Sequence, residues 1–379
     1  TWKAYLKAHF VSGMADVLPK AVDDARFAFY GTTQSGQPQQ RERWKRAVDA
    51  TEGAVGEAVG KVYIDRHFKP EAKVAMVELV ENLRKAMAKN LDGLDWMGEE
   101  TKKEAHDKLQ KFTPKIGYPE KFETYETLNV TADNAFANSI AADHWEWEDM
   151  ISQLGKPIDR DEWFMFPQTV NAYYSPNRNE IVFPAAILQP PFFDLGADDA
   201  VNYGAIGAVI GHEMGHGFDD QGAKSDGDGK LRNWWTKEDT NAFKERTGKL
   251  VKQYNAFCPI KDGDKDKCVN GVLTLGENIG DLGGLSMAYT AYKLSLNGKE
   301  APVIDGLTGD QRFFLSWAQV WQRLYREEEL RRRLDTDPHS PAAYRINGVV
   351  RNMDQWYKAF NVTEDHAMYL PPEQRVKIW

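Results

Sequence analysis

Apolar residues recur at helical spacing through the first hundred positions of the chain. Near the start they fall four residues apart, at Leu6, Phe10, Met14 and Leu18. Residues four apart share one face of an α-helix, and the stretches 44–68 and 71–94 repeat apolar residues in the same way. We therefore predict that residues 1–105 are mainly helical. The segment 30–40 is rich in Gly, Thr, Gln and Ser and is predicted to be a loop.

Two short segments further along have the composition of β-strands. They are residues 168–174 and 180–183, and the Ser-Pro-Asn-Arg-Asn sequence between them is a turn signal. Residues 113–163 give mixed signals, so no element is predicted there. The whole pattern predicts a mainly α protein with a small β-sheet, an α+β fold. An edge strand of that sheet would be available to an extended peptide.

The clearest chemistry lies in the sequence His212-Glu-Met-Gly-His216. Two histidines four residues apart lie one helical turn from each other on the same face, so both imidazoles can reach one Zn²⁺ ion. Glu213 lies beside them, where it can take a proton from a water molecule. Residues 203–211 are small and apolar, which is typical of a buried, closely packed helix. The alternative is an ordinary helix with two unrelated histidines.

A catalytic zinc site needs a third protein ligand. The metzincin spacing requires Gly and His at the positions of Asp219 and Gly222, and the aminopeptidase spacing requires Glu at the position of Trp235. Neither spacing fits. Glu277 and Asp281 are four apart in Gly-Glu-Asn-Ile-Gly-Asp, so one helix face would carry both carboxylates. Glu277 would bind zinc, and Asp281 would orient a ligand histidine through a hydrogen bond.

A solvent-exposed helix face is the alternative explanation of this acidic pair. The neighbouring side chains argue against it, because they are apolar at Leu275, Ile279, Leu282 and Leu285. Glycines at positions 280, 283 and 284 also permit close approach of another backbone. We therefore favour one metal ligand and one orienting carboxylate over a solvated face.

Composition narrows the classes of function and the compartment. The formal net charge of −9 argues against a nucleic-acid-binding surface. No apolar run is long enough to span a membrane. The two cysteines, Cys258 and Cys268, flank a charged loop. A disulfide between them would indicate an extracytoplasmic location, in a bacterial periplasm or secreted, whereas two free thiols in the cytoplasm are the alternative.

Several motifs taken together resemble the neprilysin family (M13) of zinc endopeptidases, which includes endothelin-converting enzyme and bacterial PepO-type enzymes. Besides the two segments described above, the resemblance rests on Asn171-Ala-Tyr-Tyr174, the apolar stretch 179–193 and Asp337-Pro-His-Ser-Pro341, in the family's order. It runs along the whole chain. Val376 stands where animal members have a cysteine, so the chain resembles the bacterial PepO-like members more closely.

The resemblance implies a fold and a division into domains. Residues 106–379 would form a thermolysin-like zincin catalytic domain. Residues 1–105 would be the remainder of a helical lid domain. Compared with the family, the chain lacks an N-terminal portion of comparable size and starts at Thr1 within a predicted helix. An N-terminally truncated protein is therefore expected, and the missing portion is a candidate partner.

The resemblance also implies roles for individual residues at the reaction centre. His212, His216 and Glu277 would bind one Zn²⁺ ion per chain. Glu213 would be the general base. His339 would stabilise the negatively charged oxygen that forms on the cleaved carbonyl.

Further residues are expected around that centre. Asp219 and Asp281 would orient the ligand histidines, and Asp281 is also the position that the family labels as a proton donor. Arg345 would hold a substrate carbonyl, while Asn171 and Ala172 would bind the substrate backbone like an added strand. The pocket for the side chain that follows the cleaved bond would be lined by Ile187, Phe192, Val209 and Trp321. Plain core packing is the alternative for the pocket residues.

The sequence therefore predicts a zinc-dependent endopeptidase. It would hydrolyse oligopeptides on the amino side of hydrophobic residues, with peptides as substrates and no nucleic acid or membrane span. A truncated, catalytically silent peptide-binding module is the alternative. A zinc hydrolase for non-peptide amides is a third reading, which the strand-like element at Asn171 and Ala172 disfavours.

Overall fold

The computed structural model describes residues 1–263 and 265–379, which form two compact units. Unit 1 consists of Thr1–His67, Pro119–Gln168 and Tyr325–Arg332. Unit 2 consists of Phe68–Tyr118, Thr169–Leu324 and Arg333–Trp379. The boundary predicted after residue 105 falls inside helix α5 (Glu99–Gln110), which belongs to unit 2. The assignment of lid and catalytic domains stays a prediction, and every predicted site residue lies in unit 2.

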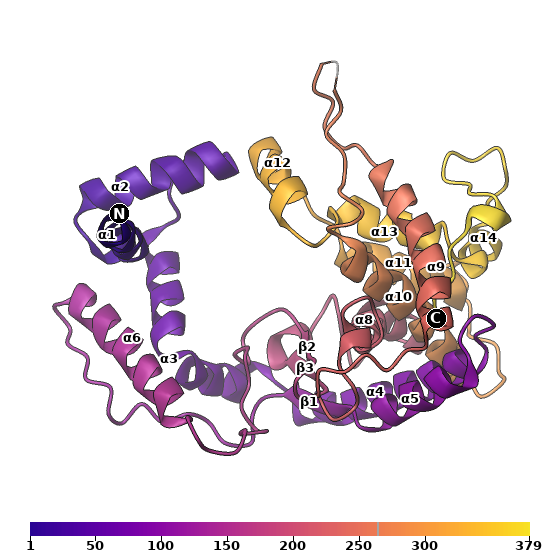
Figure 1. Ribbon diagram of the computed structural model, residues 1–379, viewed down its shortest axis with the longest axis horizontal. Coiled ribbons are helices and arrows are strands. Elements are labelled where there is room, and N and C mark those ends of the chain that lie inside the picture. Colours follow the sequence, from indigo (N-terminus) through magenta and orange to yellow (C-terminus); the bar gives the residue numbers. More distant parts are fainter. Residues whose placement is uncertain (264) are drawn as a thin grey trace. The chain divides into compact units, whose positions relative to one another are not determined.

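Unit 1 is helical. Its α-helices are α1 (Trp2–Gly13), α2 (Lys20–Arg26), α3 (Arg43–His67) and α6 (Ala135–Ser152) (Figure 1). A π-helical segment, Phe27–Thr33, follows α2, so the prediction of a loop over 30–40 is wrong for its first residues. Many large apolar side chains of unit 1 are exposed, including Trp2, Leu6, Phe10, Trp44 and Trp147. A core of its own is therefore poorly developed in this unit.

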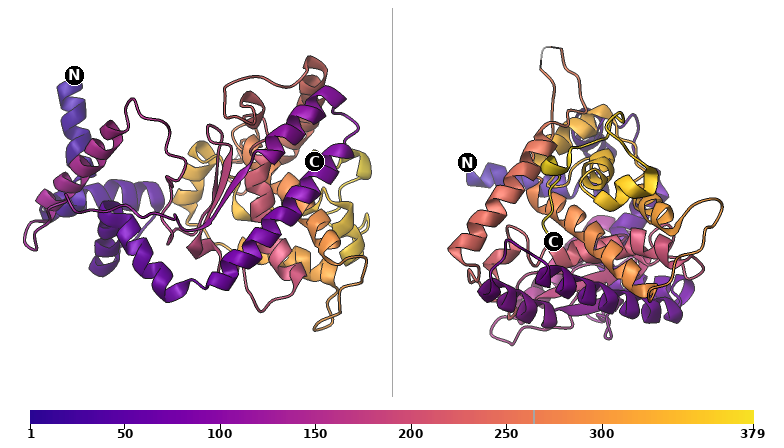
Figure 2. Two further views of the ribbon diagram at one scale, coloured as in Figure 1. Left: turned by 90° about the horizontal axis from the view of Figure 1, so that it is seen from below. Right: turned by 90° about the vertical axis from the view of Figure 1, so that its right-hand side faces the viewer.

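Unit 2 holds the longer part of the chain and its main core. Its α-helices are α4 (Pro70–Asp92), α5, α7 (Asp199–Asn202), α8 (Ala208–Gly215), α9 (Lys237–Asn255), α10 (Leu275–Ser295), α11 (Gly309–Val320), α13 (Ala342–Val350) and α14 (Asp354–Phe360). Helix α12 (Glu327–Thr336) contributes residues to both units. Helices α4 and α5 pack against each other, as the ribbon views show (Figure 2). The helix predicted over 71–94 is confirmed as α4.

A small sheet lies in unit 2. Its strands are β1 (Thr113–Gly117), β2 (Tyr173–Ser175) and β3 (Glu180–Pro184), in the order β1-β3-β2. The central strand β3 is buried throughout, and it pairs parallel to β1 and antiparallel to β2. The fold class, mainly α with a small β-sheet, is confirmed.

The strand predictions are correct only in part. The turn between the two predicted strands is confirmed, because β2 ends at Ser175 and β3 begins at Glu180. The strand predicted over 168–174 is wrong in extent, since Asn171 and Ala172 precede β2 instead of lying in it. Strand β1 was not predicted, because its Thr-Pro-Lys start shows no apolar alternation and only pairing with β3 makes it a strand.

Glycines allow the two helices that carry the candidate site to approach each other at backbone distance. A Cβ atom on Gly211 of α8 would lie 2.6 Å from the carbonyl oxygen of Gly284 on α10. A Cβ on Gly280 would lie 2.8 Å from Nδ1 of His212. Any side chain at these positions would push α8 and α10 apart. The glycines noted in the sequence therefore set the distance between the histidines and the acidic pair.

Two further expectations have structural outcomes. Cys258 and Cys268 form a disulfide bond and are not two free thiols. Within the part of the chain that the structure describes, no helix combines the length and apolar character needed to cross a membrane.

Candidate metal centre

Helix α8 carries the histidine pair in a buried setting. All of its residues are buried, and a π-helical segment, Tyr203–Gly207, leads into it. His212 and Glu213 are each 6% exposed, and His216 follows directly at the C-terminal cap of the helix. Small residues upstream of the histidines permit this burial, because they let neighbouring helices pack closely on α8.

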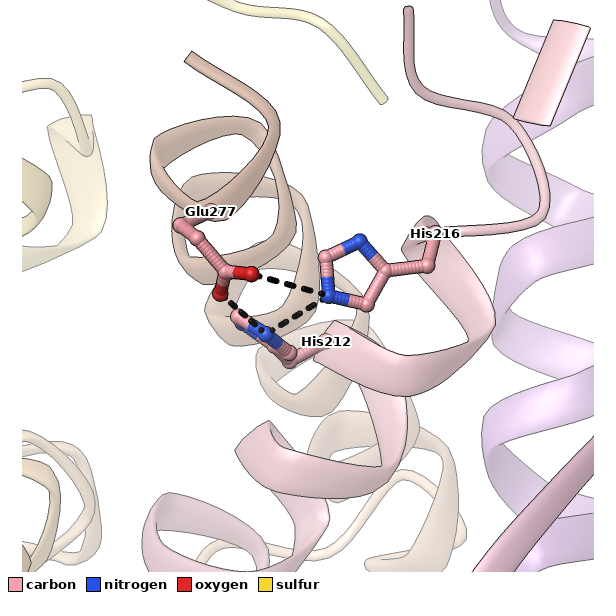
Figure 3. Close-up of side chains that lie close together, drawn as sticks. All are labelled: His212, His216 and Glu277. Atoms are coloured by element: carbon pink, nitrogen blue, oxygen red, sulfur yellow. Dashed lines mark hydrogen bonds and ion pairs between the residues drawn. The ribbon is translucent and has the colours of Figure 1, made fainter. Parts of the chain in front are cut away.

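The side chains of His212, His216 and Glu277 converge from α8 and α10 (Figure 3). The Nε2 atoms of the two imidazoles are 3.0 Å apart. The Glu277 carboxylate places one oxygen 3.1 Å from Nε2 of His212 and the other 3.8 Å from Nε2 of His216. The possible ligand atoms of all three residues lie within 4.8 Å of one another. The structure thus brings together the three residues that the sequence proposed as ligands.

The donor set fits a zinc ion. Two imidazole nitrogens and one carboxylate oxygen are a usual set of protein ligands for catalytic zinc, which keeps a further position open. Oε2 of Glu277 is buried and accepts no hydrogen bond from any residue that the structure describes, although Nε2 of His212 and Nε2 of His339 lie 3.1 and 3.2 Å away. A buried carboxylate oxygen without a donor is costly unless a cation compensates it.

Nδ1 of each histidine lies within hydrogen-bonding distance of a carboxylate. Nδ1 of His212 lies 2.9 Å from Oδ1 of Asp281, and Nδ1 of His216 lies 2.8 Å from Oδ2 of Asp219. A proton shared on the Nδ1 side leaves the Nε2 lone pair of each ring directed at the centre. The backbone N–H groups of Gln221 and Gly222 both donate to Oδ1 of Asp219 at 2.8 Å, which fixes that carboxylate in turn.

Arg345 lies against Asp281, and its predicted contact with a substrate carbonyl stays a prediction. Its Nε and Nη2 atoms donate to the two oxygens of Asp281, each at 2.7 Å. The guanidinium is buried and stacks 3.8 Å from the ring centre of Trp321. Two of its donors are therefore used inside the protein, in a chain that runs from Arg345 through Asp281 to His212. A substrate carbonyl could be reached only by the remaining N–H groups.

His339 also reaches the centre, and a residue absent from the predicted set holds it there. Oδ1 of Asp337 accepts hydrogen bonds from both the backbone N–H and Nδ1 of His339, each at 2.8 Å. The hydroxyl of Ser340 donates to Asn278 on α10 at 2.7 Å and ties this segment to the helix of Glu277. The Asp-x-His spacing in the motif was the sequence signal for Asp337.

The buried charges shift the pKa values at the centre in opposite directions. Burial alone would lower the pKa of His212, but the nearby carboxylates of Asp281 and Glu277 outweigh burial and raise it to about 10. Burial acts to raise the pKa of Asp281, but Arg345 and His212 hold it below its ordinary value. Burial raises the pKa of Glu213. Burial therefore favours the protonated form of Glu213, whereas the neighbouring cations keep Asp281 ionised.

The residues predicted to bind substrate differ in their location and burial. Asn171 and Ala172 lead directly into the edge strand β2. Ile187 and Val209 are buried and Trp321 contacts Arg345, so the role of these residues and of Phe192 as pocket lining stays a prediction. A pocket of about 490 Å³ opens directly beside His216 and Glu277, and its mainly apolar wall includes Tyr174, Pro176, Val272, Leu273 and Pro338.

Comparison with known proteins agrees with this geometry. Two family models, both described as peptidase family M13, match residues 1–119 and 171–376. Human (Homo sapiens) neprilysin is 38% identical over 386 residues, which cover 98% of this chain and 50% of neprilysin. Endothelin-converting enzyme 1 of Bos taurus is 38% identical over 99% of this chain and 50% of its own length. The chain thus spans about half the length of these relatives.

Solved structures show the same fold. The zinc metalloprotease Zmp1 of Mycobacterium tuberculosis, in complex with an inhibitor, is 53% identical with a TM-score of 0.96 and covers 100% of this chain and 57% of its own. PepO from Lactobacillus rhamnosis is 32% identical with a TM-score of 0.87, over 97% of this chain and 56% of its own. These findings confirm the predicted resemblance to the neprilysin family and the thermolysin-like fold. The chain belongs to peptidase family M13.

Proposed function

We propose that this chain is the catalytic portion of a zinc-dependent endopeptidase. The observation that carries the proposal is the convergence of Nε2 of His212, Nε2 of His216 and the Glu277 carboxylate, each imidazole backed by its own carboxylate. Glu213 is buried in the same helix turn, and the family match supports this chemistry.

The proposed reaction divides between the cation and the side chains. A zinc ion held by His212, His216 and Glu277 would supply Lewis acidity, which lowers the pKa of water to about 7 and polarises a peptide carbonyl. The Glu213 carboxylate takes a proton from the attacking water and passes it to the leaving nitrogen. Its raised pKa suits both steps, because the carboxyl group must hold the proton between them.

His339 is proposed to stabilise the oxygen that becomes negatively charged. Its Nδ1 is engaged by Asp337, which orients the ring so that Nε2 faces the centre. Nε2 lies 3.2 Å from the Glu277 carboxylate and therefore borders the reaction centre.

Asp281 is proposed to orient His212 and not to donate a proton. Both of its oxygens accept hydrogen bonds from Arg345, and Oδ1 also faces Nδ1 of His212. Its lowered pKa keeps it ionised, so it has no proton to deliver at neutral pH. Asp219 would do the same for His216. Arg345 would serve mainly as the counter-ion of Asp281 and only with its remaining donors as a substrate contact.

Substrate is proposed to bind as an extended peptide along the edge that Asn171, Ala172 and β2 form. Residues Ile187, Phe192, Val209 and Trp321 would receive a hydrophobic side chain on the carboxyl side of the cleaved bond. The pocket beside His216 would accept a second side chain. Digestion of a peptide library tests this, and cleavage sites without enrichment of hydrophobic residues after the cut would contradict it.

The exposed apolar side chains of α1, α3 and α6 suggest that a further portion of the protein covers unit 1. Self-association and binding of an apolar dye by the chain alone are expected, and a monomer that binds no dye would contradict this.

The disulfide bond supports an extracytoplasmic location, periplasmic or secreted, which fractionation of the source cells tests.

Removal of the metal should abolish peptidase activity reversibly. Dialysis of the chain against a strong chelator should release one zinc ion per chain and stop cleavage of a quenched peptide, and stoichiometric Zn²⁺ should restore it. Metal analysis and fluorescence measure both. Cleavage that persists without metal would exclude the proposed mechanism, whereas bound zinc without any cleavage would favour the silent peptide-binding module.

Substitution of His339 by alanine should lower the turnover number and leave the metal in place. Loss of one donor to an oxyanion costs about 10²- to 10³-fold in kcat. The zinc content should not change, because the side chain is not in the proposed ligand set. Stoichiometric zinc loss from His339→Ala would show that the ligands were assigned wrongly.

A further inference from the structure

A lysine that the reaction does not use is buried in unit 2. Lys108 on α5 is 1% exposed. Its Nζ atom donates hydrogen bonds to the carbonyl oxygens of Gly222 and Ser225, at 2.8 and 2.7 Å, and lies 3.4 Å from the Ser225 hydroxyl. The ammonium group therefore binds the loop that follows helix α8.

Aromatic rings complete the surroundings of this ammonium group. Nζ lies 5.7 Å from the ring centre of Tyr174, 5.9 Å from that of Phe218 and 5.6 Å from that of Trp234. Burial lowers the pKa of Lys108 to about 7, and the nearby carboxylates of Asp219 and Asp226 oppose this. A buried charge is costly, and here carbonyl groups, aromatic rings and the two carboxylates compensate it.

A continuous set of hydrogen bonds joins Lys108 to a proposed metal ligand. Lys108 binds the carbonyl of Gly222, whose N–H donates to Oδ1 of Asp219. Oδ2 of Asp219 then holds Nδ1 of His216. Gly222 has no space for a Cβ atom, because the backbone of His216 and Gly217 is in contact with it. A shift of Gly222 would therefore move the carboxylate that orients the His216 ring.

A second set of contacts links the same position to the substrate-binding edge. The side-chain amide of Asn179 donates to the backbone carbonyl of Lys108 at 3.0 Å and to that of Gly227 at 3.2 Å. The hydroxyl of Tyr174, on strand β2, donates to Oδ1 of Asn179 at 3.1 Å. The backbone of α5 thus supports β2 while the Lys108 side chain supports the loop after α8.

We propose that Lys108 is a positioning residue of the metal centre. Its ammonium group holds residues 217–225 so that Asp219 presents the His216 ring in the geometry that binds zinc. The inference rests on the proposed zinc peptidase function. A purely structural lysine would contribute to stability and have no separate effect on the metal.

The test compares Lys108→Met with Lys111→Met. Methionine keeps most of the volume of the lysine stem but removes every donor. Lys111 is the C-terminal cap residue of the same helix, is 40% exposed at its side chain and pairs with Asp107 and Asp228, so it is a matched control. Zinc affinity is measured by competition with a chromophoric chelator, and the visible spectrum of the Co²⁺-loaded protein reports ligand geometry.

Lys108→Met should bind zinc about tenfold more weakly, the lower end of the effect of groups that orient metal-bound histidines. Its Co²⁺ spectrum should change and its kcat should fall more than its KM rises. Lys108→Arg should restore part of the affinity, while Lys111→Met should match the wild type. If Lys108→Met does not fold, Lys108→Leu takes its place, because it also removes every donor.

A folded Lys108 variant without a donor at this position that keeps wild-type zinc affinity and Co²⁺ spectrum would overturn the inference, even if its thermal stability were lower. Failure of the wild-type chain to bind zinc would instead overturn the proposed function. The two outcomes are therefore distinguishable.

Discussion

Replacement of Glu213 by glutamine should remove the peptidase activity and leave the zinc site and the fold intact. Glutamine has nearly the same size as glutamate but cannot accept the proton of the attacking water. General-base groups contribute about 10²- to 10⁴-fold to a rate, so kcat/KM should fall by about that factor. The measurement is hydrolysis of a quenched peptide, together with zinc content and circular dichroism of the same preparation.

The role of Glu213 can be tested separately from metal binding, because Glu213 borders the metal centre and is not among its proposed ligands. Glu277→Gln is the matched comparison, since it changes a carboxylate of the same type that is a proposed ligand. This variant should lose zinc affinity as well as activity. Near-normal turnover by Glu213→Gln, or equal zinc loss from both variants, would contradict the assignment of base and ligand.

Substitution of Asp281 by alanine should destabilise the protein and weaken zinc binding at the same time. Asp281 is 1% exposed and links Arg345 to His212, so its removal leaves the buried guanidinium without its counter-ion. Breaking a buried ion pair from one side costs about 3–5 kcal/mol. Loss of the group that orients a ligand histidine costs about 10- to 100-fold in metal affinity. Chemical denaturation and chelator competition measure the two effects.

The double variant Asp281→Ala with Arg345→Met separates these effects. Without the guanidinium, no unpaired charge remains buried, so the double variant should be more stable than Asp281→Ala while zinc binding stays weak. Because the pKa of Asp281 is lower in the folded protein, the stability it provides is present above about pH 4 and is lost as the pH falls through its folded pKa. A double variant less stable than Asp281→Ala would contradict the ion-pair explanation.

The fold was predictable where local periodicity decides it. Apolar spacing located α4, and the turn sequence located the connection from β2 to β3, because both depend on neighbouring residues. Strand β1 escaped prediction since its pairing partner, β3, is distant in sequence and supplies the hydrogen bonds that define it. The end of the π-helical segment, residues 30–33, was predicted to be a loop because its Gly and Thr residues are usual in turns.

The centre itself was predictable to the extent that residue types and spacing determine it. The spacing of His212 and His216 within one helix turn is local geometry, and the carboxylates four apart at Glu277 and Asp281 follow the same rule. The hydrogen-bond partner of each group was harder to predict from the sequence. Asp337 was recognised only as part of a motif, and the contact of Arg345 with Asp281 was not predicted.

By itself the sequence determined which side chains could bind a metal and which helix face presents each pair, because the helical repeat places residues four apart on one side. Only the tertiary structure decided that the two faces meet. Glycines at the crossing of α8 and α10 remove the side chains that would keep the helices apart, and burial then forces each charge to find a partner. The choice among those partners depends on distances in space, which no local spacing encodes.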